Sequence, residues 1–321
     1  MACFREIILA IRAHSGQGVL EAYMSELNTQ DLHPEIWKRF DRYVHGLIDR
    51  RGFLDGTAQY AGGSMTAVGI LEAPSPRCAE AQIQVHANNS RVGTERVEIA
   101  SPDGNGMIRA LVARPAGATG RIPTVVVIHE NRGLNPHIED VVRRAAVAGF
   151  MAIGPDALTS LGGYPGTDEA GVEMQRKLEQ PKMMADFLAA VRYVKGRSDS
   201  TGCLGAVGFC FGGQPQAKDV PKIRAALLIH YAENDDRINS GWPAYEAALN
   251  ANRISHQQFT YPGTPHGCHN DTTPRFNREA AALAWARTIA LFQRAPEDSV
   301  ATTALPFGVL PCGSCSGQPL A

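Results

Sequence analysis

Between residues 92 and 292, short strand-like runs alternate with helical segments, and this alternation restricts the fold more than any other feature. Thr124–His129 is a largely β-branched run of the kind found in strands buried on both faces. Apolar and helical periodicity predicts strands over 97–99, 108–112, 150–153, 204–207, 226–229 and 258–261, and helices over 137–148, 182–195 and 280–292. The sequence therefore predicts an α/β fold with a mostly parallel sheet and helices on both faces.

Turn and cap residues support these boundaries. Asp103-Gly104-Asn105-Gly106 separates the first two predicted strands and is a strong hairpin signal. Gly149 can end the helix over 137–148, and Pro181 can begin the helix over 182–195.

The chain is expected to have three parts. Residues 1–81 are predicted to be an N-terminal helical arm, because apolar residues recur at helical spacing over 34–48. Residues 82–294 hold the regular α/β pattern. Residues 295–321 are rich in Gly, Pro and Ser and are expected to form an unstructured tail.

The arm also resembles an export leader. Arg50-Arg51 is followed by the weakly apolar run Gly56–Leu71 and by Ala79-Glu80-Ala81, which is the pattern of a twin-arginine signal. On this interpretation the mature protein is periplasmic and starts near Gln82. The alternative is a cytoplasmic protein whose helical arm stays attached.

Charge and cysteine content exclude several classes. The 31 Lys and Arg residues balance 32 Asp and Glu residues, so no basic surface points to nucleic acid or to an anionic membrane. No run of 18 apolar residues predicts a membrane span. The only CxxC, Cys312-Gly-Ser-Cys315, lies in the tail without the strand and helix that a redox motif needs, and no metal or other cofactor is expected.

A nucleophile motif follows the predicted strand over 204–207. In Gly208-Phe209-Cys210-Phe211-Gly212 a cysteine occupies the serine position of the nucleophile elbow, a sharp turn that needs small residues on either side. The alternative is a buried, inert cysteine beside a glycine turn.

Two partners follow in the order that such a fold requires. Asp235, with Asp236 as the lesser candidate, comes after the strand that ends at Ile229, and His266 lies in a turn after the strand over 258–261. Nucleophile, acid and histidine is the chain order of α/β hydrolases. In such a triad, histidine takes the thiol proton and the acid orients the imidazole.

From Pro123 to Gln293 the chain resembles the dienelactone hydrolase (carboxymethylenebutenolidase) family. The resemblance rests on the stretches 126–135, 208–213, 230–238 and 261–271. It implies that Cys210 is the nucleophile, Asp235 the acid and His266 the base. It also implies that Glu130 holds the resting thiol and takes its proton. The oxyanion hole would be formed by the backbone N–H groups of Phe211 and Asn131. The family's substrate-binding arginine is not matched, because Asn270 occupies its region.

The chain also departs from the family just after the motif. Only Gln214–Arg224, which contains Pro215 and Pro221, stands where the family has a helix and a strand, and those prolines preclude an ordinary helix. Three functions therefore compete. They are a cysteine-dependent hydrolase of a small ester or lactone acting through an acyl thioester, an impaired relative that only binds ligand, and a thiol-redox protein that uses Cys210 with Cys268 or Cys312.

Overall fold

The computed structural model describes residues 33–44, 47–60, 83–213, 217–294 and 301–302. The chain divides into two compact units, residues 1–75 and 76–321. Each unit is described by itself.

In its described residues, the first unit has two short helices, α2 (Pro34–Val44) and α3 (Arg50–Thr57), followed by the 3-10 turn η2 (Ala58–Tyr60). Ile36, Phe40 and Phe53 are buried between the helices. The predicted helix ends at Val44, before Leu47, which is 57% exposed.

Arg50 and Arg51 form the first turn of α3, where the Asp49 carboxylate accepts a hydrogen bond from the N–H of Gly52. Most of the apolar run of the leader, and its Ala79–Ala81 site, lie outside the described residues. Export of the protein stays a prediction.

The second unit is built on one eight-stranded sheet in the order β1-β2-β4-β3-β5-β8-β6-β7. The pairs β1–β2 and β2–β4 are antiparallel and the others are parallel, which confirms the mostly parallel α/β prediction. The strands are β1 (Val92–Ser101), β2 (Gly106–Pro115), β3 (Ile122–Ile128), β4 (Met151–Asp156), β5 (Ser200–Gly208), β6 (Ala226–Asn234), β7 (His256–Pro265) and β8 (Ala301–Thr302).

The predicted hairpin connects the first two strands, with Ser101 opposite Gly106. Gly106 has a φ of 87°, a left-handed conformation that glycine adopts without steric cost. All seven strands that the apolar pattern predicted are present.

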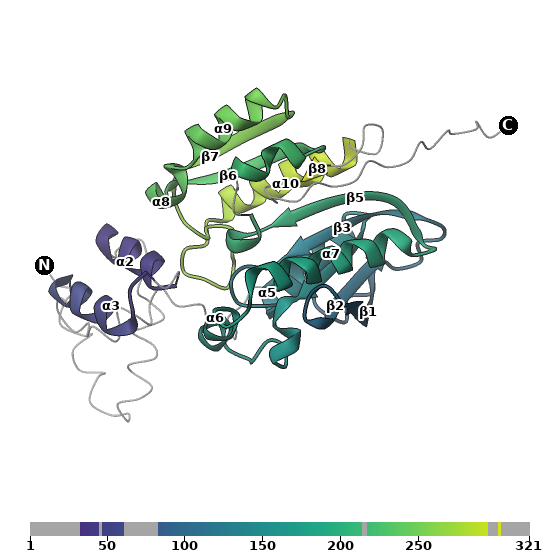
Figure 1. Ribbon diagram of the computed structural model, residues 1–321, viewed down its shortest axis with the longest axis horizontal. Helices are drawn as coiled ribbons and strands as arrows, with labels where there is room; N and C mark the ends of the chain where they lie inside the picture. The colour runs from purple at the N-terminus through teal and green to yellow at the C-terminus, as the bar shows by residue number, and fades with distance from the viewer. Residues whose placement is uncertain (1–32, 45–46, 61–82, 214–216, 295–300, 303–321) are drawn as a thin grey trace, which may run out of the picture. The chain divides into compact units, whose positions relative to one another are not determined.

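Helices cover both faces of the sheet (Figure 1). Val126 and Ile128 of β3 belong to the same core as α7, whereas Val125 and Val127 belong to the core of α5 and α10, because alternate side chains of a strand point to opposite faces. The described residues of this unit form the helices α5 (Pro136–Val147), α6 (Asp168–Gln175), α7 (Gln180–Gly196), α8 (Asp236–Asn239), α9 (Trp242–Ala251) and α10 (Arg278–Arg294). They also form the 3-10 helices η4 (Ala157–Leu161), η5 (Cys210–Gly213) and η6 (Ala217–Lys222). No helix of the described residues is long and apolar enough to cross a membrane.

The connection from β5 to β6 differs from an ordinary crossover. It contains only η5 and η6 among the described residues, and η6 includes Pro221. β5 and β6 are not direct neighbours, because β8 lies between them and pairs with both. Thus Ala301–Thr302, from the segment expected to be an unstructured tail, forms part of the sheet.

Candidate active site

Four strand ends lie at one edge of the sheet. Ile128 of β3 lies opposite Gly208 of β5, so Cys210 and Glu130 each follow their paired residue by two positions. Asn234 of β6 pairs with Pro265 of β7, and Asp235 and His266 directly follow these last strand residues. The carboxyl ends of parallel strands face the crevice in which α/β proteins bind ligands.

Cys210 sits on a sharp, sterically constrained turn. Its φ is 51°, a left-handed conformation that is uncommon outside glycine, as expected for a nucleophile elbow. A Cβ atom on Gly212 would lie 2.7 Å from Ile128 Cγ2 and 2.8 Å from the Ile128 carbonyl oxygen. Gly212 is therefore required where the turn passes close to the end of β3.

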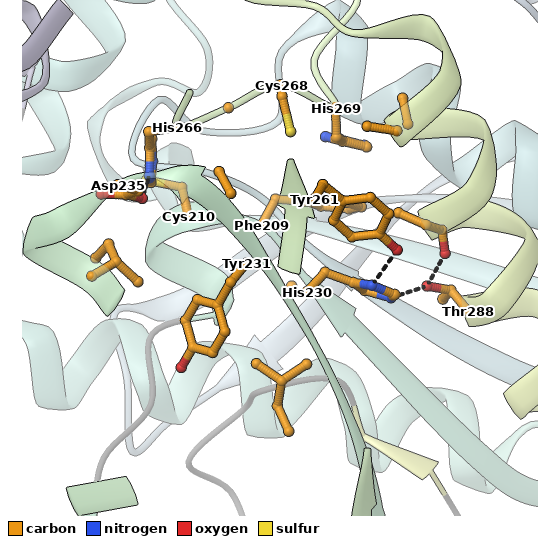
Figure 2. A pocket seen from close by; sticks show the side chains of 18 of the residues that line it. Phe209, Cys210, His230, Tyr231, Asp235, Tyr261, His266, Cys268, His269 and Thr288 are labelled. Carbon is orange, nitrogen blue, oxygen red and sulfur yellow. Dashed lines mark hydrogen bonds and ion pairs between the residues drawn. The ribbon is translucent and has the colours of Figure 1, made fainter. Parts of the chain in front are cut away.

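Asp235 and His266 are directly hydrogen-bonded. His266 Nδ1 lies 2.5 Å from Asp235 Oδ2, and Figure 2 shows both side chains next to Cys210. Asp235 is buried, whereas Asp236 is exposed as the first residue of α8, so the structure brings Asp235 to the histidine.

The charge state of His266 follows from these neighbours. Burial lowers its pKa, but the charge of Cys210 and hydrogen bonds to Asp235 and Cys210 outweigh burial and raise the pKa of His266 to about 10. The imidazole is therefore protonated at neutral pH, with Asp235 and Cys210 as its hydrogen-bond partners.

Glu130 is buried and held by two side chains. Its Oε2 accepts a hydrogen bond of 2.9 Å from Asn270 Nδ2 and lies 3.6 Å from Arg132 Nη1. Burial raises the pKa of Glu130, but the charges of Arg132, His137, His269 and Arg275 lower it to about 2. Glu130 is therefore an ionised carboxylate.

Arg132 links the Glu130 carboxylate to Asp168. Its Nη1 donates to Asp168 Oδ2 at 2.9 Å, and its side chain is only 5% exposed. Burial lowers the pKa of Arg132, but Glu130, Asp168 and the Cys210 sulfur raise it above its ordinary value. The guanidinium is thus a fixed positive charge that acts on both Glu130 and Cys210.

The expected oxyanion-hole residues lie at the ends of neighbouring strands. Phe211 follows Cys210 in η5, and Asn131 follows Glu130 three residues beyond the end of β3. The pairing of Ile128 with Gly208 brings these two segments side by side.

A pocket opens over these residues. Glu130, Cys210, Asp235 and His266 line it together with apolar side chains of β6 and α10, among them Leu228, Ile229, Ala281, Ala284 and Trp285. Its walls are mostly apolar, with few polar groups, which is typical of a small-molecule site.

Two further histidines line the pocket. His230 Nδ1 lies 2.9 Å from Tyr261 Oη and its Nε2 lies 3.1 Å from Thr288 Oγ1 (Figure 2). His269 stacks on Phe209 with ring centroids 4.1 Å apart. Burial lowers the pKa of His230 to about 4 and that of His269 to about 3, so both rings are neutral at pH 7.

Sequence reasoning did not identify Arg132, His269 or Asn270 as parts of the site. Arg132 lies two residues after Glu130, in the stretch 126–135 that carries the family resemblance, and this short spacing is the sequence feature that could have indicated its role. The Asn270–Glu130 bond joins residues 140 positions apart, and no local pattern predicts it. We assign no metal or cofactor to these residues.

Cys268 also lines the pocket. Burial raises the pKa of its thiol and so lowers its thiolate fraction. Cys312, the other expected redox partner, lies outside the described residues.

Comparison with known proteins agrees with this geometry. The sequence profile of the dienelactone hydrolase family matches residues 108–217 and 214–295, two pieces that meet in the link after Cys210. A profile described as YqhI-like matches residues 24–62 of the other unit.

Two relatives align with this chain over most of their own length. "Putative hydrolase fragment YghX" of Escherichia coli is 45% identical over 115 residues, which are 36% of this chain and 97% of that protein. "Putative carboxymethylenebutenolidase" of Synechocystis is 30% identical over 233 residues, 60% of this chain and 94% of the relative. In fold, the chain is similar to the crystal structure of a "Putative Dienelactone Hydrolase" from Klebsiella pneumoniae, with a TM-score of 0.54 and 22% identity, over 63% of this chain and 99% of that one.

The mostly parallel sheet carries a constrained cysteine turn, an acid and a histidine at strand ends on one edge, and this arrangement defines the class as an α/β hydrolase. Within that class, the family profile spans more than half of the chain. The chain belongs to the dienelactone hydrolase family, and it is a hydrolase of this family.

Proposed function

We propose that the protein hydrolyses a small ester or lactone, with Cys210 as nucleophile, His266 as base and Asp235 as the acid that orients the base. The observation that carries the proposal is the 2.5 Å hydrogen bond between His266 and Asp235, at a histidine whose raised pKa reflects the adjacent Cys210 sulfur. Three residues distant in sequence thus form one chain of proton-transfer groups in an apolar pocket.

The reaction begins with a thiolate and an imidazolium, because His266 retains the proton of Cys210 at neutral pH. The sulfur attacks the carbonyl carbon of the substrate, and the resulting oxyanion accepts hydrogen bonds from the backbone N–H groups of Phe211 and Asn131. As the C–O bond breaks, His266 Nε2 donates its proton to the leaving alkoxide. A water molecule, deprotonated by His266, then hydrolyses the acyl thioester and releases the carboxylate.

Glu130 and Arg132 set the charge around the sulfur. The family resemblance implies that Glu130 accepts the proton of the thiol. A carboxylate with a pKa of about 2 is a weak base, however, and this favours His266 as the group that accepts the proton. We assign Glu130 the role of holding Arg132 beside Cys210, so that the guanidinium offsets the negative charge of the carboxylate.

A panel of activated esters and small lactones, with detection of the acylated protein by intact mass, tests the proposal. We expect turnover and a mass increase equal to the acyl group, both abolished in Cys210→Ala. Cys203→Ala, in strand β5 before the nucleophile turn, is the matched control and should retain both. Turnover that persists in Cys210→Ala would refute the cysteine mechanism.

The second candidate function is ligand binding without turnover. The observation that favours it is η5, which spans only four residues, Cys210–Gly213, with the nucleophile itself as the first of them. Saturable binding of an ester that is never hydrolysed and never acylates Cys210 would select it. Peroxide consumption that depends on added thiol, with an oxidised Cys210, would select the redox alternative.

A further inference from the structure

The pocket extends from Cys210 away from the proposed base. In Figure 2, His230, Tyr261 and Thr288 lie on the opposite side of Cys210 from His266. In the proposed reaction His266 gives its proton to the leaving group, so the leaving group lies on the side of His266. The acyl group stays bonded to the sulfur and therefore extends to the opposite side.

The walls on this opposite side come from β6 and α10. His230 of β6 is hydrogen-bonded to Thr288 of α10, and Leu228 points to the same face of the sheet because it lies two residues before His230. We call this part of the pocket the β6–α10 subsite, and its wall consists of Leu228, His230, Ala281, Ala284, Trp285 and Thr288.

Small residues of α10 leave the subsite open. Ala281, Ala284 and Thr288 are three and four residues apart, so they share one face of the helix, and all three line the pocket. Ala282 lies on another face and is exposed. The space in the subsite is therefore set by two methyl groups of α10.

The volume limits what the pocket can hold. The cavity measures about 180 Å³ and is lined mostly by apolar side chains. An apolar cavity of about 150 Å³ holds one benzene molecule. With the reacting carbonyl at Cys210, the remaining space takes roughly one six-membered ring or a short branched alkyl chain.

The polar groups of the subsite are hydrogen-bonded within the protein. The Thr288 hydroxyl donates to the Ala284 carbonyl oxygen at 2.9 Å, so His230 Nε2 is the donor in its 3.1 Å bond to Thr288. His230 Nδ1 then accepts from the Tyr261 hydroxyl at 2.9 Å, and Tyr261 accepts from Arg287 at 3.2 Å. The hydroxyl and imidazole hydrogens of this network are thus already used.

The subsite also lacks a positive charge for an anionic group. Among the described residues, no Lys or Arg lines the pocket, and His230 is neutral because burial lowers its pKa to about 4. The two carboxylates that line the pocket are Glu130 and Asp235. A carboxylate on the acyl group would lose its hydration here without a counter-ion, which is energetically costly.

We propose that the β6–α10 subsite selects esters whose acyl group is uncharged, apolar and about the size of one six-membered ring. The inference rests on the proposed function, because it assigns a place and a chemical class to the acyl group of that reaction.

A pair of isosteric esters tests the charge. The trifluoroethyl ester of isohexanoic acid and the trifluoroethyl monoester of succinic acid have acyl groups of the same shape, with a CH(CH₃)₂ group in one and a carboxylate in the other. We expect kcat/KM at pH 7 to be at least about 100-fold higher for the isohexanoate. Equal values for the two esters would overturn the proposal.

Ring esters and two leucine variants test the size. Trifluoroethyl naphthoate should react at least about 10-fold more slowly than trifluoroethyl benzoate. Ala284→Leu should lower the ratio of kcat/KM for benzoate to that for acetate by about 10-fold or more, and Ala281→Leu should act in the same direction. Ala282→Leu, at the exposed position of the same helix, is the matched control and should keep the wild-type ratio. A ratio that neither Ala284→Leu nor Ala281→Leu changes, or a naphthoate as fast as the benzoate, would overturn the proposal.

Binding to Cys210→Ala separates the subsite from the proposed function. This variant lacks the nucleophile, so the esters act as ligands, and the isohexanoate and benzoate esters should raise Tm whereas the succinate monoester should not. If no ester is hydrolysed or acylates Cys210 in the wild type, the proposed function fails, while this pattern of Tm shifts still supports the subsite. Equal shifts with all three esters, or no shift with any of them, would overturn the subsite.

Discussion

Replacing Gly212 by alanine perturbs the turn of Cys210 without altering any reacting group. An added Cβ atom would lie 2.7 Å from Ile128 Cγ2, 2.8 Å from the Ile128 carbonyl oxygen and 3.0 Å from the His129 carbonyl oxygen. Two of these atoms belong to the backbone at the end of β3, a buried strand of the sheet. Because this backbone is fixed by its neighbours on both sides, the turn itself has to move.

The size of the movement sets the expected loss. To reach an ordinary contact of 3.4 Å, the methyl group has to withdraw by about 0.6 to 0.7 Å from the Ile128 atoms. A misplacement of about 1 Å can cost on the order of 100-fold in rate, so we expect a loss in kcat/KM of roughly 10- to 100-fold.

The assay compares kcat/KM on one activated ester and the rate of Cys210 alkylation by iodoacetamide. Gly93→Ala is the matched control, because a Cβ atom on Gly93 meets nothing within 4 Å and its φ is not left-handed. We expect Gly93→Ala to retain the wild-type rates and Gly212→Ala to lose turnover while its unfolding stays cooperative. Equal rates in the two variants would refute the idea that close backbone contact holds the nucleophile.

Three further predictions concern charge. Because the folded pKa of Glu130 is lowered to about 2, its carboxylate stabilises the fold above pH 4.5 and loses this effect as the pH falls toward 2. Glu130→Gln should therefore lower the free energy of unfolding by roughly 3 kcal/mol at pH 7 and make Tm fall less steeply in acid. An unchanged dependence of Tm on acid pH would contradict the assignment. The stabilisation by His266 depends on pH in the opposite direction: because its pKa is raised, it stabilises the fold below pH 6.5, and this effect is lost as the pH rises through about 10. In Cys210→Ala the midpoint of the His266 titration, followed by NMR, should move to lower pH. An unmoved midpoint would rule out the interaction with the sulfur. Asp235→Asn should lower kcat/KM by about 10²- to 10⁴-fold, whereas Asp236→Asn, at the exposed neighbour, should keep kcat/KM within about twofold of the wild type. Equal losses would show that the two acids were assigned wrongly.

Local patterns predicted most of the fold because the forces behind them are local. The β-branched run of β3 marks a strand whose alternate residues Val125 to Ile128 are buried on both faces, and the apolar stripe of α7 marks one buried helix face. The order of Cys210, Asp235 and His266 along the chain, each just after a strand, was sufficient to propose them as one site. Parallel strands bring such residues to the same edge whatever the sequence between them.

Three properties were decided by tertiary structure alone. Asp235 and Asp236 are neighbours in the sequence, and only packing at the end of β6 buries one against His266 and exposes the other. The pairing of Glu130 with Asn270 and Arg132 depends on loops that meet in space, and it makes the carboxylate a fixed charge with a lowered pKa.

The third property is the insertion of β8 between β5 and β6. The sequence determined that the link after Cys210 is too short and too rich in proline for an ordinary helix and strand. It could not determine which segment covers the exposed strand edges, because backbone hydrogen bonds carry no side-chain signature. Only the three-dimensional arrangement brings Ala301 and Thr302 to those edges, where they pair with strands far from them in the sequence.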